Sequence, residues 1–341
     1  VAMRAQSAGT DLYNWVTQPE QQFSGSAGYS DYDFRDPMVV WNAQQQNYWM
    51  LITSRYNNQA AIGLYTSTDL QNWTPQAPLY LEDSALNLEV PDYFSLDGTP
   101  FIVYSDQRDE SRQVKYLQQL DGVWTKPDFD AVDGRAFYAA RTAGSADERL
   151  LFGWVAHTEG RIDGNKYDWG GDLMVHQVRQ TGGRLQVELP QKLKQALAEP
   201  VTVDSVWTQG SVAADNGQLQ LGAAAAFTLQ KLAVKNRLSL QLSAAASDAV
   251  FGVQLRKVNA DQTESHAFIE INSAAGIVSY KAEPAGTNPI YPTIQLPLDA
   301  QQGVALDILL DPLAGVGAVY INQDKALSFR LYELADYDVG I

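Results

Sequence analysis

Short apolar runs separated by polar turns recur along the first 190 residues, and they come in sets. Three complete sets can be recognised: 38–41, 48–54 and 60–66; then 92–96, 100–105 and 114–120; then 135–142, 149–156 and 172–179. The runs are rich in β-branched and aromatic residues and are bounded by turn formers, a pattern that predicts β-strands. Sets of three or four antiparallel strands that repeat at intervals of about 50 to 60 residues are typical of β-propeller blades.

An internal repeat supports this interpretation. The segment TDLYNW at residues 10–15 returns as TDLQNW at 68–73, and a weaker copy, LDGVW, lies at 120–124. Only residues 2–7 precede the first copy as a strand-like run, so we expect the chain to begin inside a blade. A plain β-sandwich in which these segments resemble each other by coincidence is the alternative that the repeat alone leaves open.

The pattern changes after Leu189-Pro190. Residues 191–199 predict a short helix, and alternating runs of period two then continue to the end, which predicts a β-sandwich. We expect an incomplete propeller that forms the catalytic domain over 1–190, a linker over 191–203 and a C-terminal sandwich over 204–341. The predicted sandwich strands are 218–221, 238–242, 250–258, 267–271, 277–281, 304–310, 317–321 and 326–331.

Composition narrows the classes of function. The 341 residues carry a formal net charge of −16, which disfavours nucleic acid, anionic membranes and polyphosphates as partners but suits a neutral sugar. The chain has no cysteine, so disulfides and thiolate chemistry are excluded. No apolar run reaches the length of a membrane span. The histidines His157, His176 and His266 lack metal-ligand spacing, so we expect no metal site.

Three acidic residues stand where the strand sets begin, namely Asp36, Glu89 and Asp133. The innermost strand of each propeller blade lines the central channel, so acids at equivalent positions converge on one ligand. Glycosidic bond cleavage needs such a pair of carboxyl groups, one to protonate the leaving oxygen and one to act as nucleophile or base. A single acid in such a place is more often a solvated loop carboxylate. The interpretation therefore depends on the three together, with Trp169 as a candidate aromatic wall of the same pocket.

These residues lie in motifs that resemble glycoside hydrolase family 32, the invertases, inulinases and levanases. The matching segments, in order, are Arg35-Asp36-Pro37, then Glu89-Val90-Pro91-Asp92 with valine in place of the family's cysteine, Asp133-Gly134 with Phe137-Tyr138-Ala139, Leu151-Phe152-Gly153-Trp154, and Arg330-Leu331-Tyr332. The resemblance implies an all-β fold with a five-bladed β-propeller, N-terminally incomplete here, followed by a β-sandwich. It also implies the release of fructose from sucrose or fructans by a retaining mechanism without a cofactor.

The resemblance assigns roles to individual residues. Glu89 would be the general acid/base, and Asp36 the stabiliser of the transition state, with Arg35 beside it. Asp133 and Tyr138, together with Trp169, would bind the sugar. A general acid must be protonated near neutral pH, so we expect desolvation or neighbouring carboxylates around Glu89.

One family motif is missing. The nucleophile of the family lies in an Asn-Asp-Pro-Asn-Gly segment of the first blade, and this chain has none; Asp311-Pro312 in the second half is interpreted as a turn. We therefore expect a chain that lacks the first blade and part of the second, and that is inactive alone. Two alternatives stay open: a five-bladed glycosidase of the arabinan or xylan type, and a carbohydrate-binding propeller that has lost catalysis. Linkage preference, compartment and oligomeric state are left open too.

Overall fold

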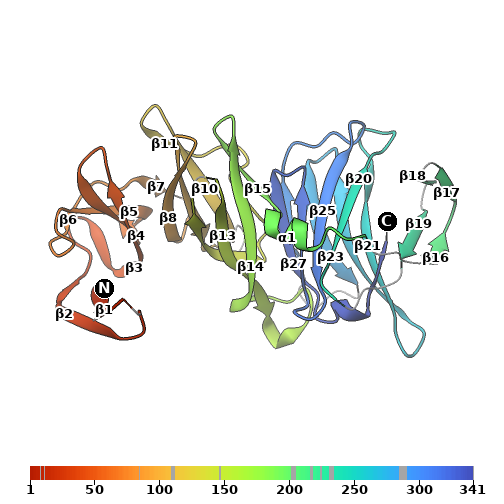
Figure 1. Ribbon diagram of the computed structural model, residues 1–341, viewed down its shortest axis with the longest axis horizontal. Helices are drawn as coiled ribbons and strands as arrows, with labels where there is room; N and C mark the ends of the chain where they lie inside the picture. The colour runs from red at the N-terminus through yellow and green to blue at the C-terminus, as the bar shows by residue number, and fades with distance from the viewer. Residues whose placement is uncertain are drawn as a thin grey trace. The chain divides into compact units, whose positions relative to one another are not determined.

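The computed structural model is built almost entirely of β-strands (Figure 1). It describes residues 1–341 except 8, 11, 84, 109–111, 146, 201–204, 216–217, 223–224, 230–233, 284–289 and 341. Asp11 of the first repeat copy, residues 201–203 of the predicted linker and the final residue therefore lie outside the described part. None of the described helices is long and apolar enough to cross a membrane.

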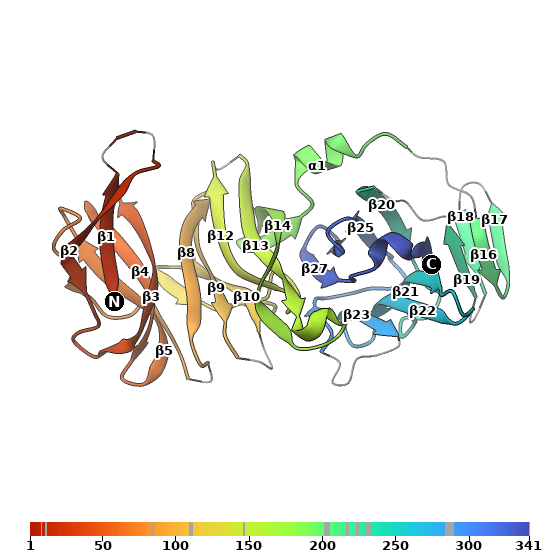
Figure 2. The same ribbon diagram turned by 90° about the horizontal axis from the view of Figure 1, so that it is seen from below.

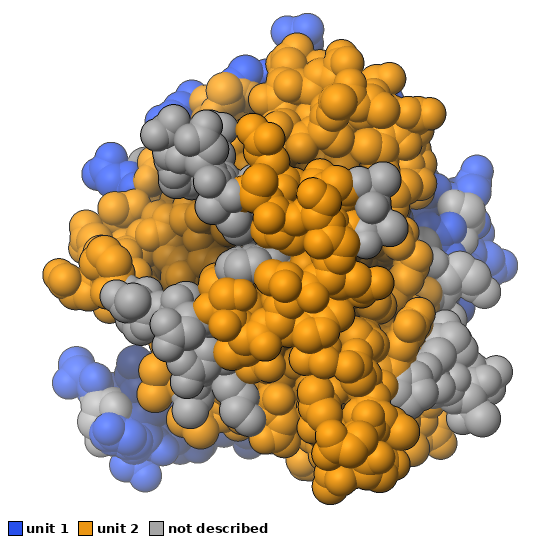
Figure 3. Space-filling view, turned by 90° about the vertical axis from the view of Figure 1, so that its right-hand side faces the viewer, with its two compact units in different colours: residues 1–130, 139–147, 182–184 blue, residues 131–138, 148–181, 185–341 orange. Residues whose placement is uncertain are grey.

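The chain divides into two compact units, coloured separately in Figure 3. Unit 1 comprises residues 1–130, 139–147 and 182–184, and unit 2 comprises 131–138, 148–181 and 185–341. The boundary between propeller and sandwich that the sequence suggests, near residue 190, stays a prediction.

Unit 1 contains a hairpin and two larger antiparallel sheets. The hairpin pairs β1 (Ala2–Ser7) with β2 (Trp15–Phe23). The first sheet has the order β3-β4-β5-β6, with β7 also paired to β5, and the second has the order β11-β10-β9-β8. Their bounds are β3 Tyr29–Asn42, β4 Asn47–Tyr56, β5 Gln59–Ser67, β6 Thr74–Pro75, β7 Tyr80–Glu82, β8 Leu88–Leu96, β9 Thr99–Asp106, β10 Gln113–Leu120 and β11 Val123–Thr125.

The two larger sheets of unit 1 share a hydrophobic core. Leu51 and Ile62 of the first sheet and Ile102 and Leu117 of the second are each fully buried in one cluster. Six predicted strands, two sets of three, are confirmed as β3–β5 and β8–β10. β3 is much longer than predicted because it begins at Tyr29 and includes the polar segment that carries Arg35 and Asp36.

A third sheet has the order β12-β13-β14-β15. Its strands confirm the third predicted set, and Gly182 and Gly183 have positive φ values of 59° and 82°, as a two-residue type I′ hairpin turn requires. The helix α1 follows and is shorter than predicted. The bounds are β12 Phe137–Gly144, β13 Arg149–Thr158, β14 Tyr167–Thr181, β15 Arg184–Glu188 and α1 Gln191–Ala196, with the 3-10 turn η1 at Glu159–Arg161.

The rest of unit 2 is a β-sandwich, whose layers are visible in Figure 2. A seven-stranded sheet has the order β16-β19-β28-β21-β22-β23-β24, a four-stranded sheet has the order β20-β25-β26-β27, and β17 pairs with β18. Residues of both larger sheets, such as Ile269 and Ile308, are buried in one core. The bounds are β16 Ser205–Gln209, β17 Val212–Asp215, β18 Gln218–Leu221, β19 Ala226–Leu229, β20 Asn236–Leu242, β21 Val250–Val258, β22 Glu264–Asn272, β23 Ile277–Glu283, β24 Thr293–Gln295, β25 Val304–Asp311, β26 Val316–Ile321, β27 Lys325–Arg330, η2 Leu334–Asp336 and β28 Asp338–Gly340.

The sequence missed four strands of the sandwich, β16, β17, β19 and β24. These strands have three to five residues each, too short for a period-two pattern to show. The turn predicted at Asp311-Pro312 is confirmed, because it connects β25 to β26.

Candidate active site

β3 and β8 contain the same irregularity at the two candidate catalytic motifs. Arg35 pairs with Thr53, but the next pair in the ladder is Met38 with Leu51, so β3 has one extra residue here. Glu89 likewise pairs with Ser105, and the next pair is Asp92 with Val103. Each motif is therefore a β-bulge, a feature that turns side chains away from the regular alternation of a strand.

The first bulge residue has a left-handed backbone in both cases. The φ of Asp36 is 57° and that of Val90 is 52°. A β-branched residue with positive φ is a backbone outlier, and such strain costs about 1–3 kcal/mol and clusters at functional sites. Proline follows both residues and has no N–H to leave unpaired in the interrupted ladder.

The bulges correct one part of the sequence-based alignment. By register, the residue of β3 equivalent to Glu89 is Arg35, and Asp36 is equivalent to Val90. The expectation that the three acids occupy equivalent positions is therefore wrong, although Asp36 and Glu89 still belong to one cluster.

The Asp36 carboxylate is held by a buried hydroxyl and a backbone amide. Thr53 Oγ1 donates to Asp36 Oδ2 at 2.9 Å, and the N–H of Val90 donates to the same oxygen at 3.1 Å. The Val90 N–H also lies 3.2 Å from Thr53 Oγ1, and Thr53 is fully buried. Asp36 is therefore hydrogen-bonded to Val90, the residue directly after Glu89, and 27% of its side chain is exposed.

Arg35 connects the acidic residues of the cluster. Its Nη2 donates to Glu89 Oε1 at 2.7 Å and its Nε to the same oxygen at 3.1 Å. Its Nη1 lies 3.0 Å from Asp33 Oδ1, and its Nε lies 4.0 Å from Asp36 Oδ2. Burial tends to lower the pKa of Arg35, but the hydrogen bonds to Glu89 and Asp33 outweigh it and raise that pKa. Arg35 is therefore a permanent cation at the centre of the cluster.

The surroundings of Glu89 agree in part with the expectation for a general acid. Its side chain is 13% exposed, which agrees with desolvation, and the charged group that lies 2.7 Å from it is the cation Arg35 rather than a carboxylate. One oxygen of the Glu89 carboxylate, Oε1, therefore accepts two hydrogen bonds from Arg35.

Asp33 and Asn87 also belong to the cluster, and the sequence analysis did not identify them. Asn87 Nδ2 donates to Asp33 Oδ1 at 3.2 Å and to Gln107 Oε1 at 2.8 Å. Asp33 lies on β3 two residues before Arg35, and residues two apart share a face of a strand. Asn87 lies two residues before Glu89, directly before β8 begins. That spacing is the signal that could have identified them.

Residues 139–144 of β12 belong to unit 1 and show the same local structure, a left-handed residue whose N–H binds a hydroxyl of a neighbouring strand. Ala139 has a φ of 51°, and its N–H donates to Ser105 Oγ at 3.1 Å, as the Val90 N–H does to Thr53. Arg141 Nη2 donates to the carbonyl oxygen of Asp36 at 3.0 Å. Tyr138 therefore directly precedes a left-handed residue in its strand, as Glu89 precedes Val90.

Asp133 is a buried anchor of unit 2. It is fully buried, and its Oδ2 lies 2.9 Å from His176 Nε2 and accepts a hydrogen bond from Ser328 Oγ at 2.6 Å. His176 Nδ1 in turn lies 2.9 Å from the hydroxyl of Tyr320, whose pKa burial raises well above its usual value. The assignment of Asp133 to sugar binding is corrected accordingly, because its carboxylate has no surface toward solvent.

The two aromatic candidates differ in exposure. Tyr138 is only 1% exposed, whereas Trp169 on β14 is 61% exposed, and their ring centroids lie 5.6 Å apart in an edge-to-face contact. An exposed indole face suits stacking against a sugar ring. Trp169 therefore has the exposure that its predicted role requires, and the buried ring of Tyr138 is in contact with it.

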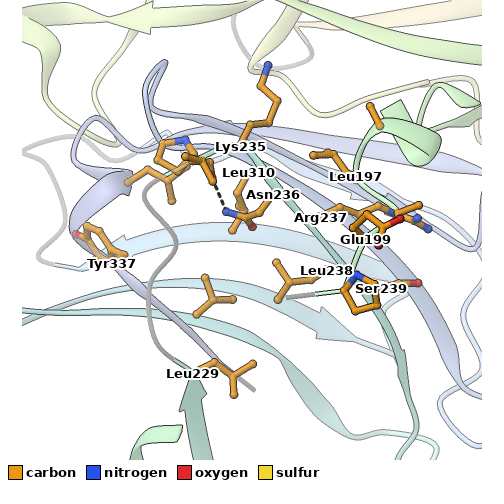
Figure 4. Close-up of a pocket in the computed structure, with 17 residues that line it drawn as sticks. Leu197, Glu199, Leu229, Lys235, Asn236, Arg237, Leu238, Ser239, Leu310 and Tyr337 are labelled. Carbon is orange, nitrogen blue, oxygen red and sulfur yellow. Dashed lines mark hydrogen bonds between the residues drawn. The ribbon is translucent and has the colours of Figure 1, made fainter. Parts of the chain in front are cut away.

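Unit 2 also contains an apolar pocket of about 520 Å³ between α1 and β20, shown in Figure 4. Aliphatic side chains such as Leu197, Leu238 and Leu310 line it, and its cations Lys235 and Arg237 are paired with Asp311 and Asp307. It contains none of the predicted site residues. Within the described part of the chain, no group of three or more histidine, aspartate or glutamate side chains could hold a metal ion.

Comparisons with known proteins place these observations in one family. Residues 4–182 match the family model described as glycosyl hydrolases family 32 N-terminal domain. A sucrose-6-phosphate hydrolase of Staphylococcus xylosus is 28% identical over 169 residues, which is 45% of this chain but only 34% of that protein. The match thus spans about a third of this curated relative.

Two solved structures have a similar fold. A family 32 β-fructofuranosidase of Bombyx mori superposes with a TM-score of 0.64 at 18% identity, covering 97% of this chain and 68% of that one. A fructan 1-exohydrolase of Cichorium intybus gives a TM-score of 0.67 at 14% identity, covering 96% of this chain and 72% of that one. At these identities the likeness concerns the fold.

Proposed function

The chain belongs to glycoside hydrolase family 32, and from that premise we propose that its protein releases fructose from sucrose or fructans. The relatives named above include a sucrose-6-phosphate hydrolase and a fructan exohydrolase, which supports a fructosyl substrate. We also propose that the three sheets β3–β7, β8–β11 and β12–β15 are blades of a five-bladed propeller.

The observation that carries the proposal is the hydrogen-bonded cluster of Arg35, Asp36 and Glu89 in unit 1. All three side chains are partly exposed, so a sugar can reach them. In the proposed mechanism Glu89 protonates the leaving oxygen and later takes a proton from water. The Asp36 carboxylate stabilises the positive charge that develops on the sugar ring.

In the first step Glu89 donates a proton to the leaving oxygen, whereas in the structure its Oε1 accepts hydrogen bonds from Arg35. Sugar hydroxyls that accept hydrogen bonds from Arg35 would weaken its hold on Glu89 in the occupied site.

Retaining hydrolysis also needs a nucleophile. The sequence contains no Asn-Asp-Pro-Asn-Gly segment, so we propose that the nucleophile lies outside residues 1–341. Residues 1–341 alone should then bind sugar without turnover, and the full-length protein should be active.

The direct test is product analysis of the full-length protein with sucrose, inulin, levan, arabinan and xylan. Fructose as the released sugar supports the proposal. Release of arabinose or xylose without fructose contradicts it in favour of a related propeller glycosidase, and binding of fructan without any product contradicts it in favour of a carbohydrate-binding protein.

A further inference from the structure

Gln107 lies at the edge of the catalytic cluster and has no part in the mechanism above. It directly follows β9, and its backbone N–H donates to the carbonyl oxygen of Asn87 at 3.2 Å. Its side-chain Oε1 accepts from Asn87 Nδ2 at 2.8 Å and lies 3.5 Å from Arg35 Nη2. The same Nη2 holds Glu89, so Gln107 and Glu89 share one guanidinium nitrogen.

The orientation of the Gln107 amide follows from its neighbours. The ionised carboxylate of Asp33 only accepts hydrogen bonds, so Asn87 must turn its NH2 group toward Asp33. That same NH2 group faces Gln107, which must therefore present its oxygen. Arg35, which only donates, requires the same orientation. The NH2 group of Gln107 thus points away from Asn87 and Arg35.

This NH2 group is available to a ligand. Among the described residues no partner accepts a hydrogen bond from it, and the side chain is partly exposed rather than buried. An amide fixed through its oxygen, with two donors left over, is preorganised to bind the hydroxyl oxygens of a sugar.

The guanidinium of Arg35 defines the side of the site on which Gln107 lies. Its Nε end faces Asp36 at 4.0 Å, its Nη2 end faces Gln107, and the carboxylate of Glu89 is bonded to both nitrogens. Gln107 and Asp36 therefore lie on opposite sides of Glu89. If Asp36 holds the fructosyl unit, the sugar beyond the scissile oxygen meets Gln107.

We propose that Gln107 is a specificity-determining residue whose side-chain amide donates hydrogen bonds to hydroxyl groups of the leaving-group sugar. This inference rests on the proposed function, because it needs Glu89 and Asp36 to flank the bond that is cleaved. It adds recognition of the leaving group, a property that the three-residue cluster does not provide.

The test compares two substrates of the full-length protein that have the same fructosyl unit. One is sucrose, and the other is a nitrophenyl β-fructofuranoside, whose leaving group has no hydroxyl groups. Gln107→Met should lower kcat/KM for sucrose about tenfold, which corresponds to about 1.4 kcal/mol, because hydrogen bonds to the leaving group are lost. For the nitrophenyl substrate the change should stay within about twofold.

A second variant covers the case in which Gln107→Met folds poorly, and a control variant tests an unrelated glutamine. Gln107→Glu keeps the acceptor toward Asn87 and Arg35 but removes the donors, so it should show the same selective loss even if Gln107→Met folds poorly. Gln119→Met is the matched control, since Gln119 lies at the far end of β10 and donates to Gly122. It should leave both substrates unchanged.

The possible results separate the two proposals. Equal losses on both substrates, or no loss on either, contradict the role of Gln107 while the proposed function stands. A wild-type protein that cleaves neither substrate contradicts the proposed function, and the inference about Gln107 fails with it.

Discussion

Arg35 and Glu89 occupy the same register position in two successive sheets, and the guanidinium of one lies 2.7 Å from the carboxylate of the other. Each directly precedes a bulge residue with positive φ, Asp36 or Val90. The repeat of the fold thus brings a cation and an acid together from equivalent positions, and the bulges turn Asp36 into the same cluster.

Thr53 offers the first test of this arrangement. Its hydroxyl links the Asp36 carboxylate to the backbone next to Glu89, so Thr53→Val should release Asp36 and lower kcat about tenfold. Thr53→Ser restores the hydroxyl and should recover activity to within about twofold of wild type. Steady-state kinetics with sucrose decide between the outcomes; similar activity of the valine and serine variants contradicts the positioning role.

Asp133 distinguishes a structural acid from a sugar-binding one. Asp133→Asn cannot satisfy His176 and Ser328 as the carboxylate does, so the free energy of unfolding should fall by about 2–4 kcal/mol. Urea denaturation measures this loss. The KM of the remaining folded protein should be unchanged, and a large rise in KM without loss of stability would restore the sugar-binding assignment.

The sequence predicted the sheets well because clear turns separate their strands, as in 48–54 and 100–105. These strands either alternate apolar and polar residues or are apolar throughout. The sequence motifs also singled out Arg35, Asp36 and Glu89 as candidates, and their side chains lie in one cluster. The sequence could not predict Thr53 or Gln107, because their roles depend on strand register, and a bulge of one residue decides which side chains meet. Asp133 was misassigned because its burial depends on Ser328, 195 residues further along the chain.

Asp163 gives a prediction for pH dependence. Burial raises the pKa of Asp163 to about 6, although the Tyr332 N–H donates to its Oδ1 at 3.0 Å and opposes the shift. Between about pH 4 and pH 6 the folded state therefore holds a proton that the unfolded state has lost, so stability falls as the pH rises through this range. Above about pH 6 neither state holds this proton, and its contribution to the free energy of unfolding is lost.

Asp163→Asn removes this titration and keeps an oxygen for the Tyr332 N–H. Relative to wild type, the variant should gain about 1–2 kcal/mol more at pH 7.5 than at pH 4.5, a value reduced because the side chain is partly solvated. Urea denaturation at the two pH values measures the difference. An equal effect at both pH values contradicts the raised pKa.

Release of fructose from sucrose by Glu89→Gln in the full-length protein tests most directly whether Glu89 is the acid/base of a fructosyl hydrolase. The amide keeps the size of the side chain but cannot transfer a proton, so kcat should fall by about 10²–10⁴, while the exposed control Glu20→Gln stays at the wild-type rate. Fructose release by Glu89→Gln at close to the wild-type rate would contradict the account.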